Sequence, residues 1–456
     1  MNYEDSVRFL LSLGKELASP QPASVQKFNL ENIRVLSEYL GSPHRAIPCA
    51  HVAGTNGKGS TAAMLESILR ASGFSTGLFT SPHLERINER IAINGQPISD
   101  GDFAAEFTTI HAAIESLLAN GELAAHPTFF ECLTAMAFRA FARRRTAFSI
   151  YEVGMGGRLD STNIISPEVA VITQVDFDHE DFLGHSIAEI AAEKAGIIKP
   201  GAWVVSAVDR PEARDVIARR AAAAGARLVE IDAAWSLEKT TSHHGCYSME
   251  VIESSSHARL ALDVPLRGRV QMRNALAAAT AARLLNERGF SISDAAIEQG
   301  IREVRWPGRL EQLSSNPTLL LDGAHNPSAA RGLAAFCDEH LPGRRIWLIF
   351  GALRDKAVDE IAGLLFPRAF EVFFTEPQQS RAISAALLAE LTSHLAPRFQ
   401  IVPSPSEALA RAISLAAPED VIVVTGSLYL VGHLREHWLR SFSAAQPKSN
   451  PAPTPL

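Results

Sequence analysis

The chain has 456 residues, of which 46% are hydrophobic and 20% are charged, with 43 basic and 50 acidic side chains. This length exceeds the size at which one hydrophobic core stops growing, so it predicts two or three domains, and the composition is that of a folded globular protein. The net charge of -7 excludes the basic field of a dedicated nucleic-acid binder. The apolar runs are far shorter than the roughly 20 residues of a membrane-spanning helix.

The cysteines are scattered and show no C-x-x-C spacing, which argues against a disulfide framework and against a zinc site. They are Cys49, Cys132, Cys246 and Cys337. Glu4 and Asp5 stand where a signal peptide would carry a basic segment, so no signal peptide is expected. We therefore expect a cytoplasmic protein, monomeric, with no nucleic-acid or membrane partner.

Up to about Gly201 the sequence alternates short, β-branched apolar runs with amphipathic stretches, which predicts βα units on a largely parallel sheet. The predicted strands are residues 47–53, 149–153, 169–173 and 203–208. Helices are predicted over residues 60–72 and 130–143 because their apolar residues share one helical face. The polar alternation of residues 229–264 predicts antiparallel strands.

A second run of βα units follows Trp306-Pro307-Gly308-Arg309, whose Pro and Gly end a predicted helix over residues 293–304 and indicate an interdomain hinge. Its predicted strands are residues 318–321, 345–350, 370–375, 399–402 and 420–425. The chain thus predicts an α/β protein with a P-loop-type ATPase domain of mostly parallel sheet, residues 1–305, and a smaller Rossmann-like C-terminal domain, residues 306–440. Residues 441–456, mostly rich in Pro, Ser, Ala and Asn, predict a disordered tail.

The predicted strand 47–53 is followed by the loop Gly54-Thr55-Asn56-Gly57-Lys58-Gly59-Ser60 and then by a helix. Glycines let backbone N–H groups converge on a phosphate, and the helix N-terminus adds partial positive charge. A glycine-rich turn alone needs no ligand, but three glycines with Lys58 and Ser60 at this junction predict ATP binding by residues 55–60. Lys58 supplies the cation and Ser60 a magnesium-facing hydroxyl, although the spacing departs from G-x-x-x-x-G-K-[ST].

Six further motifs follow this loop in the sequence. They are Thr80-Ser81-Pro82-His83-Leu84, Tyr151-Glu152-Val153-Gly154-Met155-Gly156-Gly157-Arg158-Leu159-Asp160, Asp178-His179, Ala191-Ala192-Glu193-Lys194-Ala195-Gly196-Ile197-Ile198-Lys199, Gly308-Arg309-Leu310 and Asp322-Gly323-Ala324-His325-Asn326-Pro327. In content and order, all seven resemble the signatures of the folylpolyglutamate synthase and dihydrofolate synthase family, relatives of the Mur ligases. The resemblance runs from about residue 28 to 432.

Glu152 ends an otherwise apolar predicted strand, where a carboxylate is costly to bury without a partner. Ligands collect at the carboxyl ends of parallel strands, and Mg²⁺ prefers hard oxygen ligands, so Ser81 and Glu152 are predicted to hold it with waters and ATP phosphates. His179 by itself is equally a metal ligand or a loop histidine. The resemblance assigns it to a second Mg²⁺.

Ser186 and Glu189 form a predicted capping box, which fixes a helix that places Lys194 in line with Ile187 and Ile190. A lysine on an apolar stripe usually extends to water. In a dry site near a metal it can instead lose its proton and react with CO₂ to form a carbamate. The resemblance implies a carbamylated Lys194 that helps to hold Mg²⁺.

The resemblance also assigns the site for dihydropteroate to three segments. They are Asn29, Leu30 and Glu31; Thr128, Phe129, Phe130 and Glu131; and Leu159, Asp160 and Ser161. Phe129 and Phe130 offer aromatic surface for a flat ring, or are core residues that open a helix, and Asp160 can accept hydrogen bonds from an amino-pyrimidine edge. Asn29-Leu30-Glu31-Asn32 stands where relatives more usually carry Gly-Leu-x-Arg.

Three more residues, Asn274, Arg309 and Asp322, match positions that contact ATP in the family, and His325 matches a group that helps to hold the incoming glutamate. From the sequence alone His325 is also a turn histidine before Pro327. We therefore expect a bifunctional dihydrofolate synthase and folylpolyglutamate synthase that uses ATP, Mg²⁺ and an acyl phosphate. Alternatives are a folylpolyglutamate synthase alone or another Mur-type amide ligase. An ATP-driven switch without amide chemistry is disfavoured by Glu152 and Lys194.

Overall fold

The computed structural model describes residues 1–13 and 29–443, and the chain divides into two compact units, Met1–Trp306 and Pro307–Leu456. The division falls within the sequence predicted as a hinge. Among the described helices, none combines the length and apolar character needed to cross a membrane.

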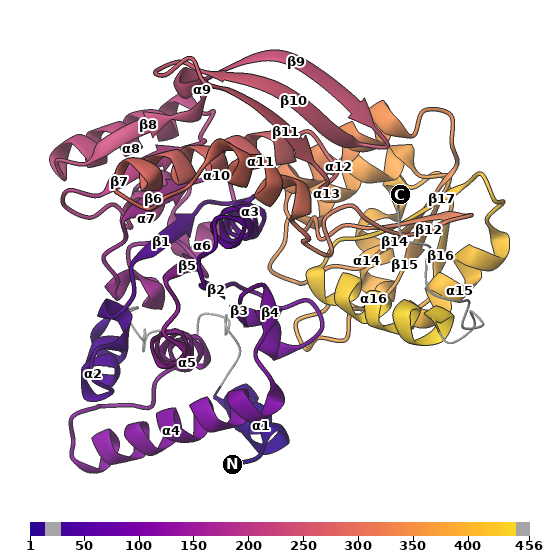
Figure 1. Cartoon of the computed structure of the whole chain (residues 1–456). Helices are drawn as coiled ribbons and strands as arrows, with labels where there is room; N and C mark the ends of the chain where they lie inside the picture. The colour runs from indigo at the N-terminus through magenta and orange to yellow at the C-terminus, as the bar shows by residue number, and fades with distance from the viewer. Residues whose placement is uncertain (14–28, 444–456) are drawn as a thin grey trace, which may run out of the picture. The chain divides into compact units, whose positions relative to one another are not determined.

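An eight-stranded sheet forms the centre of the first unit, in the order β4-β3-β2-β5-β1-β6-β7-β8 (Figure 1). The six strands from β2 to β8 in this order are parallel, and β3 and β4 run antiparallel at one edge. The strands are β1 (Cys49–Ala53), β2 (Thr76–Phe79), β3 (Ile91–Ile93), β4 (Gln96–Pro97), β5 (Phe148–Glu152), β6 (Val169–Ile172), β7 (Trp203–Ser206) and β8 (Arg227–Glu230).

Helices cover both faces of this sheet. Alternate strand residues such as Ala50 and Val52 pack with α3, α10 and α11, while the opposite face packs with α1, α2, α4 and α5 at one end and α7 and α8 at the other. The helices are α1 (Tyr3–Ser12), α2 (Glu31–Tyr39), α3 (Lys58–Ala71), α4 (Asp100–Ala119), α5 (Phe129–Arg144), α6 (Glu180–Leu183), α7 (Ile187–Ala195), α8 (Pro211–Ala223), α9 (Ile231–Ala234), α10 (Val270–Glu287) and α11 (Asp294–Glu303). Short 3₁₀ helices are η1 (Pro43–Arg45), η2 (Ile87–Arg90) and η3 (Ser161–Ile164).

The register of the central strands decides which loops meet. Val52 of β1 pairs with Glu152 of β5 on one side and with Val171 of β6 on the other. Because the three strands are parallel, the loops after Ala53, Glu152 and Ile172 leave the sheet at the same edge. The loop after β1 lies between the other two, which is where ligands bind in open α/β sheets.

A separate antiparallel sheet in the order β11-β10-β9 packs its apolar face into the core around α10 and α11. Its strands are β9 (Trp235–His243), β10 (Cys246–Glu253) and β11 (Arg259–Val264). The prediction of antiparallel strands in residues 229–264 is confirmed for this sheet. It is wrong for residues 229–230, which belong to β8 and pair in parallel with β7, and for residues 231–234, which form α9.

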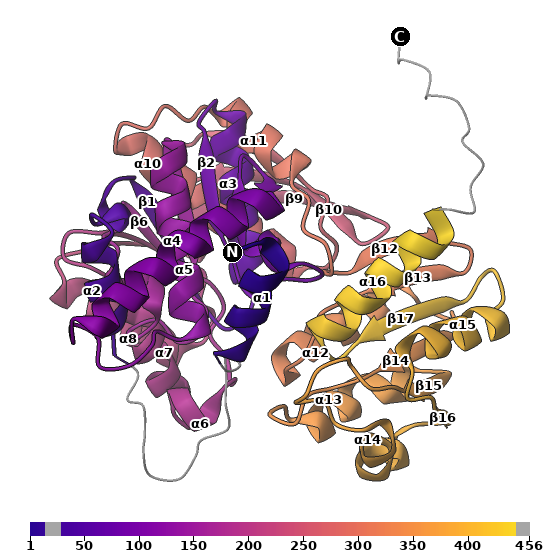
Figure 2. The same ribbon diagram turned by 90° about the horizontal axis from the view of Figure 1, so that it is seen from below.

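The second unit is a six-stranded sheet in the order β12-β13-β17-β14-β15-β16, parallel except for β12 (Figure 2). Its strands are β12 (Glu311–Ser315), β13 (Thr318–Leu321), β14 (Ile346–Phe350), β15 (Glu371–Phe374), β16 (Phe399–Ile401) and β17 (Val421–Thr425). The helices are α12 (Pro327–His340), α13 (Val358–Leu365), η4 (Phe366–Arg368), α14 (Ala385–Thr392), η5 (Ser393–Leu395), α15 (Pro405–Leu415) and α16 (Leu428–Ser443). Helices α12, α13 and α14 share one apolar core with the sheet.

The nine individually predicted strands are all present, with ends that differ by at most two residues, and the α/β fold class is confirmed. Strands β2, β3, β4, β8 and β12 were not predicted. Helix α16 continues to Ser443, so the tail predicted from residue 441 begins at least three residues too early. The rest of that tail lies outside the described residues.

Candidate active site

The loop of residues 54–60 joins β1 to α3 and contains two glycines that lie close against neighbouring side chains. A Cβ on Gly54 would lie 1.8 Å from Oγ1 of Thr173, and one on Gly57 would lie 2.4 Å from Oδ1 of Asn274. Gly57 also caps α3 with a φ of 86°, a left-handed conformation that favours glycine. The side chain of Asn274, from α10, therefore lies directly against the predicted phosphate loop.

Two other predicted ATP residues tether this loop to the segment after β6. Thr55 Oγ1 donates to the Asp176 carbonyl oxygen at 2.9 Å and accepts from its N–H at 3.1 Å. The Asn56 amide donates to Oε1 of Gln174 at 3.3 Å. The segment of residues 174–179 is thereby held beside the phosphate loop. On another side of the loop, Gly59 faces the Trp306 ring, which a Cβ on this glycine would approach to 3.0 Å.

Lys58 and Lys194 converge on one carbonyl group. Nζ of Lys58 donates to the carbonyl oxygens of Gly54 and Thr55 at 3.0 Å each, and Nζ of Lys194 donates to that of Gly54 at 2.9 Å. Burial, assisted by the Lys58 ammonium and opposed by Asp178, lowers the pKa of Lys194 to about 7. The fold thus makes a neutral amine accessible near neutral pH, which carbamate formation requires.

Glu152 is 4% exposed at the end of β5, and its Oε2 accepts a hydrogen bond from the N–H of Ser81 at 3.0 Å. The structure therefore brings together the carboxylate and the hydroxyl residue that the sequence predicted as Mg²⁺ ligands. A buried carboxylate beside a serine is a hard-oxygen donor set, which fits Mg²⁺. Its register opposite Val52 places Glu152 at the same sheet edge as the phosphate loop.

His179 lies in the loop between β6 and α6 with a left-handed φ of 52°, where it is the N-cap residue of α6. Its Nε2 lies 3.8 Å from Oδ1 of Asp178, and the charge of Asp178 acts on Lys194. His179 therefore belongs to the segment that approaches Lys194.

Two of the three predicted substrate segments meet at Gly154, two residues beyond Glu152. A Cβ on Gly154 would lie 2.6 Å from the Phe130 ring and 3.2 Å from Oδ2 of Asp160. Phe130 is half-buried and Asp160 is 7% exposed, and burial raises the pKa of Asp160 while hydrogen bonds, chiefly from Thr162, lower it. Helix α2, which begins at Glu31, packs against both α5 and η3.

Several members of these segments have structural roles. Thr128 and Glu131 form the capping box of α5, with the Thr128 N–H donating to Oε2 of Glu131 at 2.8 Å. Phe129 is 5% exposed and carries the Arg90 guanidinium 5.3 Å above its ring. The Asn29 side chain accepts a hydrogen bond from the N–H of Glu31, and the Ser161 hydroxyl is hydrogen-bonded to that of Thr134. Leu30 is buried and Leu159 is half-buried.

Sequence reasoning did not identify two residues behind Asp160. Oγ1 of Thr162 donates to Oδ1 of Asp160, and Nε2 of the fully buried His51 lies 2.8 Å from the same hydroxyl. Since the hydroxyl proton is directed to Asp160, His51 donates its Nε2 proton to Thr162. The sequence did offer one signal for His51: it is a polar residue within the otherwise apolar strand 49–53, as Glu152 is within β5.

The second unit groups its predicted residues around the turn after β13. The Asp322 carboxylate accepts from the N–H groups of Leu310 and Ala324 at 3.0 Å each, and burial raises its pKa while Arg309 lowers it. A Cβ on Gly323 would lie 2.4 Å from Nη1 of Arg309. His325 donates its Nδ1 proton to the Gly323 carbonyl oxygen at 2.8 Å. Arg309, Asp322 and His325 thus form one cluster.

Residues 52–282 match the Mur ligase middle domain, and residues 308–428 match the glutamate ligase domain of Mur ligases. The chain is 35% identical to the dihydrofolate synthase/folylpolyglutamate synthase of Bacillus subtilis, over 90% of this chain and 95% of the relative. It is also 35% identical to the folylpolyglutamate synthase of Lacticaseibacillus casei, over 96% and 98%. It spans about half the length of a Halobacterium salinarum relative, a probable bifunctional folylpolyglutamate synthase/dihydropteroate synthase, at 34% identity over 97% of this chain and 52% of the relative.

Solved structures agree with these relatives. The Mycobacterium tuberculosis folylpolyglutamate synthase complexed with ADP and AMPPCP superimposes with a TM-score of 0.85 and 32% identity, over 96% of this chain and 99% of that one. The E. coli FolC complex with DHPP and ADP gives 0.83 and 30%, over 96% and 97%. The chain therefore belongs to the folylpolyglutamate synthase/dihydrofolate synthase family of Mur-type, ATP-dependent ligases.

Proposed function

We propose that this protein joins L-glutamate to dihydropteroate and to reduced folates, acting as both a dihydrofolate synthase and a folylpolyglutamate synthase. The observation that carries both activities is the meeting of Phe130 and Asp160 at Gly154, two residues beyond Glu152. An aromatic ring beside a buried carboxylate suits a flat heterocycle with an amino-pyrimidine edge. The names of several relatives, including that of Bacillus subtilis, support the two activities together.

The reaction begins with transfer of the ATP γ-phosphoryl group to the acceptor carboxylate, because a carboxylate needs a leaving group before an amine can displace it. Backbone N–H groups of residues 55–60 and the α3 N-terminus bind the phosphates, and Lys58 neutralises their developing charge. Ser81, Glu152, His179 and Lys194 would hold two Mg²⁺ ions, which add electrostatic stabilisation of the phosphates when bound.

Lys194 takes part as a carbamate. The ammonium first loses one proton; the neutral amine then attacks the carbon of CO₂, an N–C bond forms as one C–O π bond breaks, and a second proton leaves to solvent, so that a positive side chain becomes a negative one. The lowered pKa of Lys194 supports this step because it supplies the neutral amine. A negative group beside Lys58 also removes the repulsion between two ammonium groups that share the Gly54 carbonyl.

The amino group of L-glutamate then attacks the acyl phosphate, and the tetrahedral intermediate collapses with release of phosphate. His325 is proposed to help hold this glutamate, while Asn274, Arg309 and Asp322 contact ATP. No covalent enzyme intermediate is needed, which agrees with cysteines that are free and mostly buried. Free cysteines also suit the reducing cytoplasm, where we propose that the protein acts as a monomer on small molecules.

The decisive assay supplies the purified protein with MgATP and L-glutamate, and adds dihydropteroate or tetrahydrofolate separately. We expect ADP and a glutamylated product with each acceptor, and loss of both activities in Lys58→Ala because both begin with the same phosphoryl transfer. Product from tetrahydrofolate alone would identify a folylpolyglutamate synthase only. Glutamate-dependent phosphate release without any folate would favour a different function.

Asp160→Ala distinguishes the two acceptors. It should reduce kcat/KM for dihydropteroate more than for tetrahydrofolate, because the smaller acceptor depends more on its pteridine contacts. Equal losses would contradict a dedicated dihydropteroate site.

A further inference from the structure

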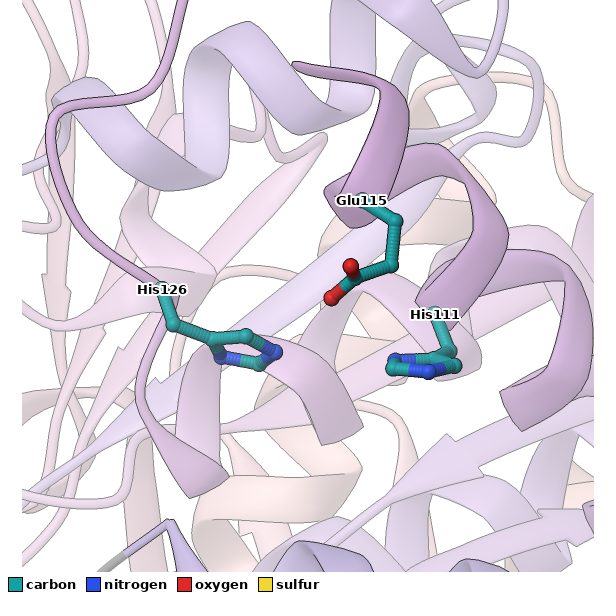
Figure 3. A group of neighbouring side chains, drawn as sticks. All are labelled: His111, Glu115 and His126. Carbon is teal, nitrogen blue, oxygen red and sulfur yellow. The ribbon is translucent and has the colours of Figure 1, made fainter. Parts of the chain in front are cut away.

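Two histidines and one glutamate gather on the outer side of the first unit, outside the residues of the candidate active site. His111 and Glu115 lie one turn apart on α4, and His126 lies in the connection from α4 to α5. One ring nitrogen of each histidine and one carboxylate oxygen of Glu115 all lie within 4.8 Å of one another. Figure 3 shows the two rings turned towards the same space, with the carboxylate of Glu115 beside it.

The hydrogen bonding of His126 leaves one nitrogen ready to bind a ligand. Its Nδ1 lies 2.7 Å from the Pro127 carbonyl oxygen, which can only accept, so Nδ1 carries the proton. Nε2 of the neutral ring then has a free electron pair, and it is buried without a hydrogen-bond partner among the described residues. Histidines that bind metals typically donate their other N–H to a carbonyl or carboxylate in this way.

His111 presents a second unsatisfied nitrogen. Its Nδ1 is likewise buried and has no hydrogen-bond partner in the described part of the chain. A buried polar atom without a hydrogen-bond partner is unfavourable, and here two such ring nitrogens belong to one cluster that also holds a carboxylate.

Aromatic packing holds both rings in place. The Phe9 ring of α1 lies 4.7 Å from that of His111 and 5.7 Å from that of His126, measured between centroids. Phe107 stacks on His111 at 5.9 Å and also contacts Phe9, with their ring centroids 5.8 Å apart. The cluster therefore has an apolar surround that limits ring rotation, while Glu115 is exposed and can move.

We propose that His111, Glu115 and His126 bind one Zn²⁺ ion, with water in the fourth position. Two imidazoles and one carboxylate form a donor set that zinc uses, and imidazole selects transition-metal ions over Mg²⁺ and Ca²⁺. Ligand atoms at tetrahedral zinc are about 3.3 Å apart, so the present spacing must contract by up to about 1.5 Å. Rotation of the exposed Glu115 side chain supplies much of this movement. The absence of cysteine motifs does not bear on this site, because it uses no cysteine.

The ion would fasten the connection between α4 and α5 to α4 itself. His126 stands two residues before Thr128, the N-cap residue of α5. Metal binding would therefore stabilise the start of α5 without contributing a group to the ligation reaction. The proposal is therefore tested by measuring bound metal and the thermal stability of the protein rather than its ligase activity.

The experiment titrates Zn²⁺, and separately Co²⁺, into the full-length protein in excess Mg²⁺ and ADP, which occupy the sites proposed for the nucleotide and its metal. We expect one tight Zn²⁺ site per chain by calorimetry, a Co²⁺ absorption spectrum of a four- or five-coordinate ion, and a rise in Tm of roughly 3–8 °C at saturation. Glu115→Gln should weaken binding by roughly tenfold or more, and His126→Phe should abolish it.

The control is His243→Ala combined with His244→Ala, which removes an exposed histidine pair whose ring centroids lie 4.2 Å apart. This control should keep the tight site, the Co²⁺ spectrum and the rise in Tm. Glu115→Gln is exposed and should fold normally, so it keeps the test valid if His126→Phe does not fold. Zinc binding unchanged in Glu115→Gln, or lost only in the control, would overturn the proposal, as would the absence of any site in the wild-type chain.

Discussion

Burial gives Lys194 an acid–base behaviour that its residue type does not have in water. Its pKa falls from 10.5 to about 7, first because the ammonium loses its hydration and second because Lys58 is close. Below pH 7 the lysine is charged in both the folded and unfolded states, and folding carries the full cost of burying that charge. Between about pH 7 and 10.5 the unfolded chain binds the extra proton, so this contribution to stability rises with pH.

Replacing Lys194 by Met should therefore stabilise the ligand-free protein while removing activity towards both acceptors. The pKa difference corresponds to an upper bound on the order of 5 kcal/mol at pH 7. Urea unfolding in CO₂-free buffer should show the variant more stable than wild type at pH 7, with a smaller difference near pH 10. Lys239→Met, at a largely exposed lysine, should show neither effect. A Lys194→Met variant destabilised equally at both pH values would contradict a costly buried charge.

The activity of Lys194 variants should show whether this residue acts through a positive charge or as a carbamate. Lys194→Arg keeps a positive charge but cannot become a carbamate, so it should be as inactive as Lys194→Ala. A short carboxylic acid is expected to restore part of the activity of Lys194→Ala alone, measured as ADP release, because only the smaller side chain leaves room for the missing negative group. An active Arg variant would contradict the carbamate.

Thr162 offers a test of positioning rather than of contact with substrate. Thr162→Val keeps the shape but removes the hydroxyl that joins His51 to Asp160. We expect kcat/KM for dihydropteroate to fall about 5–100-fold, a cost of roughly 1–3 kcal/mol, with a smaller effect on polyglutamylation. Thr392→Val makes the same change at a buried threonine of the second unit and should leave both values near wild type.

At the scale of single elements, the start of α5 raises the question of whether Glu131 caps the helix or binds substrate. Glu131 accepts from the N–H of Thr128, and the Thr128 hydroxyl accepts from that of Glu131. Burial raises the pKa of Glu131, while the hydrogen bonds with Thr128 oppose this shift. The carboxylate is thus already committed to the helix N-terminus.

Glu131→Gln keeps an acceptor for the Thr128 N–H and should retain both activities within about threefold, whereas Glu131→Ala should lose about 1 kcal/mol of stability. Thermal unfolding and kcat/KM with the two acceptors measure these outcomes. A large loss of dihydropteroate turnover in Glu131→Gln, with unchanged Tm, would restore Glu131 as a substrate ligand.

Elements with complete local signals were predictable, and elements defined by their neighbours were not. The capping box at Ser186 and the apolar face of α7 placed Lys194 correctly on a buried stripe. By contrast, β2 is four residues long and contains Gly77, which resembles a turn in the sequence. A Cβ on Gly77 would lie 2.6 Å from the Phe141 ring, so the glycine serves close packing of α5 on the sheet.

The candidate site follows the same division. The loop of residues 54–60 and Glu152 are marked by glycines and by a carboxylate in an apolar strand, and the structure brings them to one sheet edge. Thr162 carries no such mark, because its significance depends on a tertiary contact with His51, 111 residues away. The fold also gives two adjacent residues of one motif different surroundings. Phe130 faces Gly154, whereas Phe129 is buried under Arg90.

At the scale of the whole molecule, each unit has its own apolar core. Three clusters lie wholly before residue 307, and the fourth lies wholly after it. Trp306, the last residue of the first unit, packs against one of these clusters and lies over Gly59 of the phosphate loop. The first unit therefore contains both its own core and the predicted phosphate loop.

A fragment of residues 1–306 should consequently fold, unfold cooperatively and bind a fluorescent ATP analogue, yet form no glutamylated product, because Arg309, Asp322 and His325 are missing. A matched fragment of residues 1–305 lacks Trp306, so its Tm and its nucleotide affinity should both be lower, with a stability loss of roughly 1–3 kcal/mol. Calorimetry and fluorescence titration of the two fragments measure these differences. Product formation by either fragment would contradict a catalytic contribution from the second unit, and identical behaviour of the two would show that Trp306 does not support the phosphate loop.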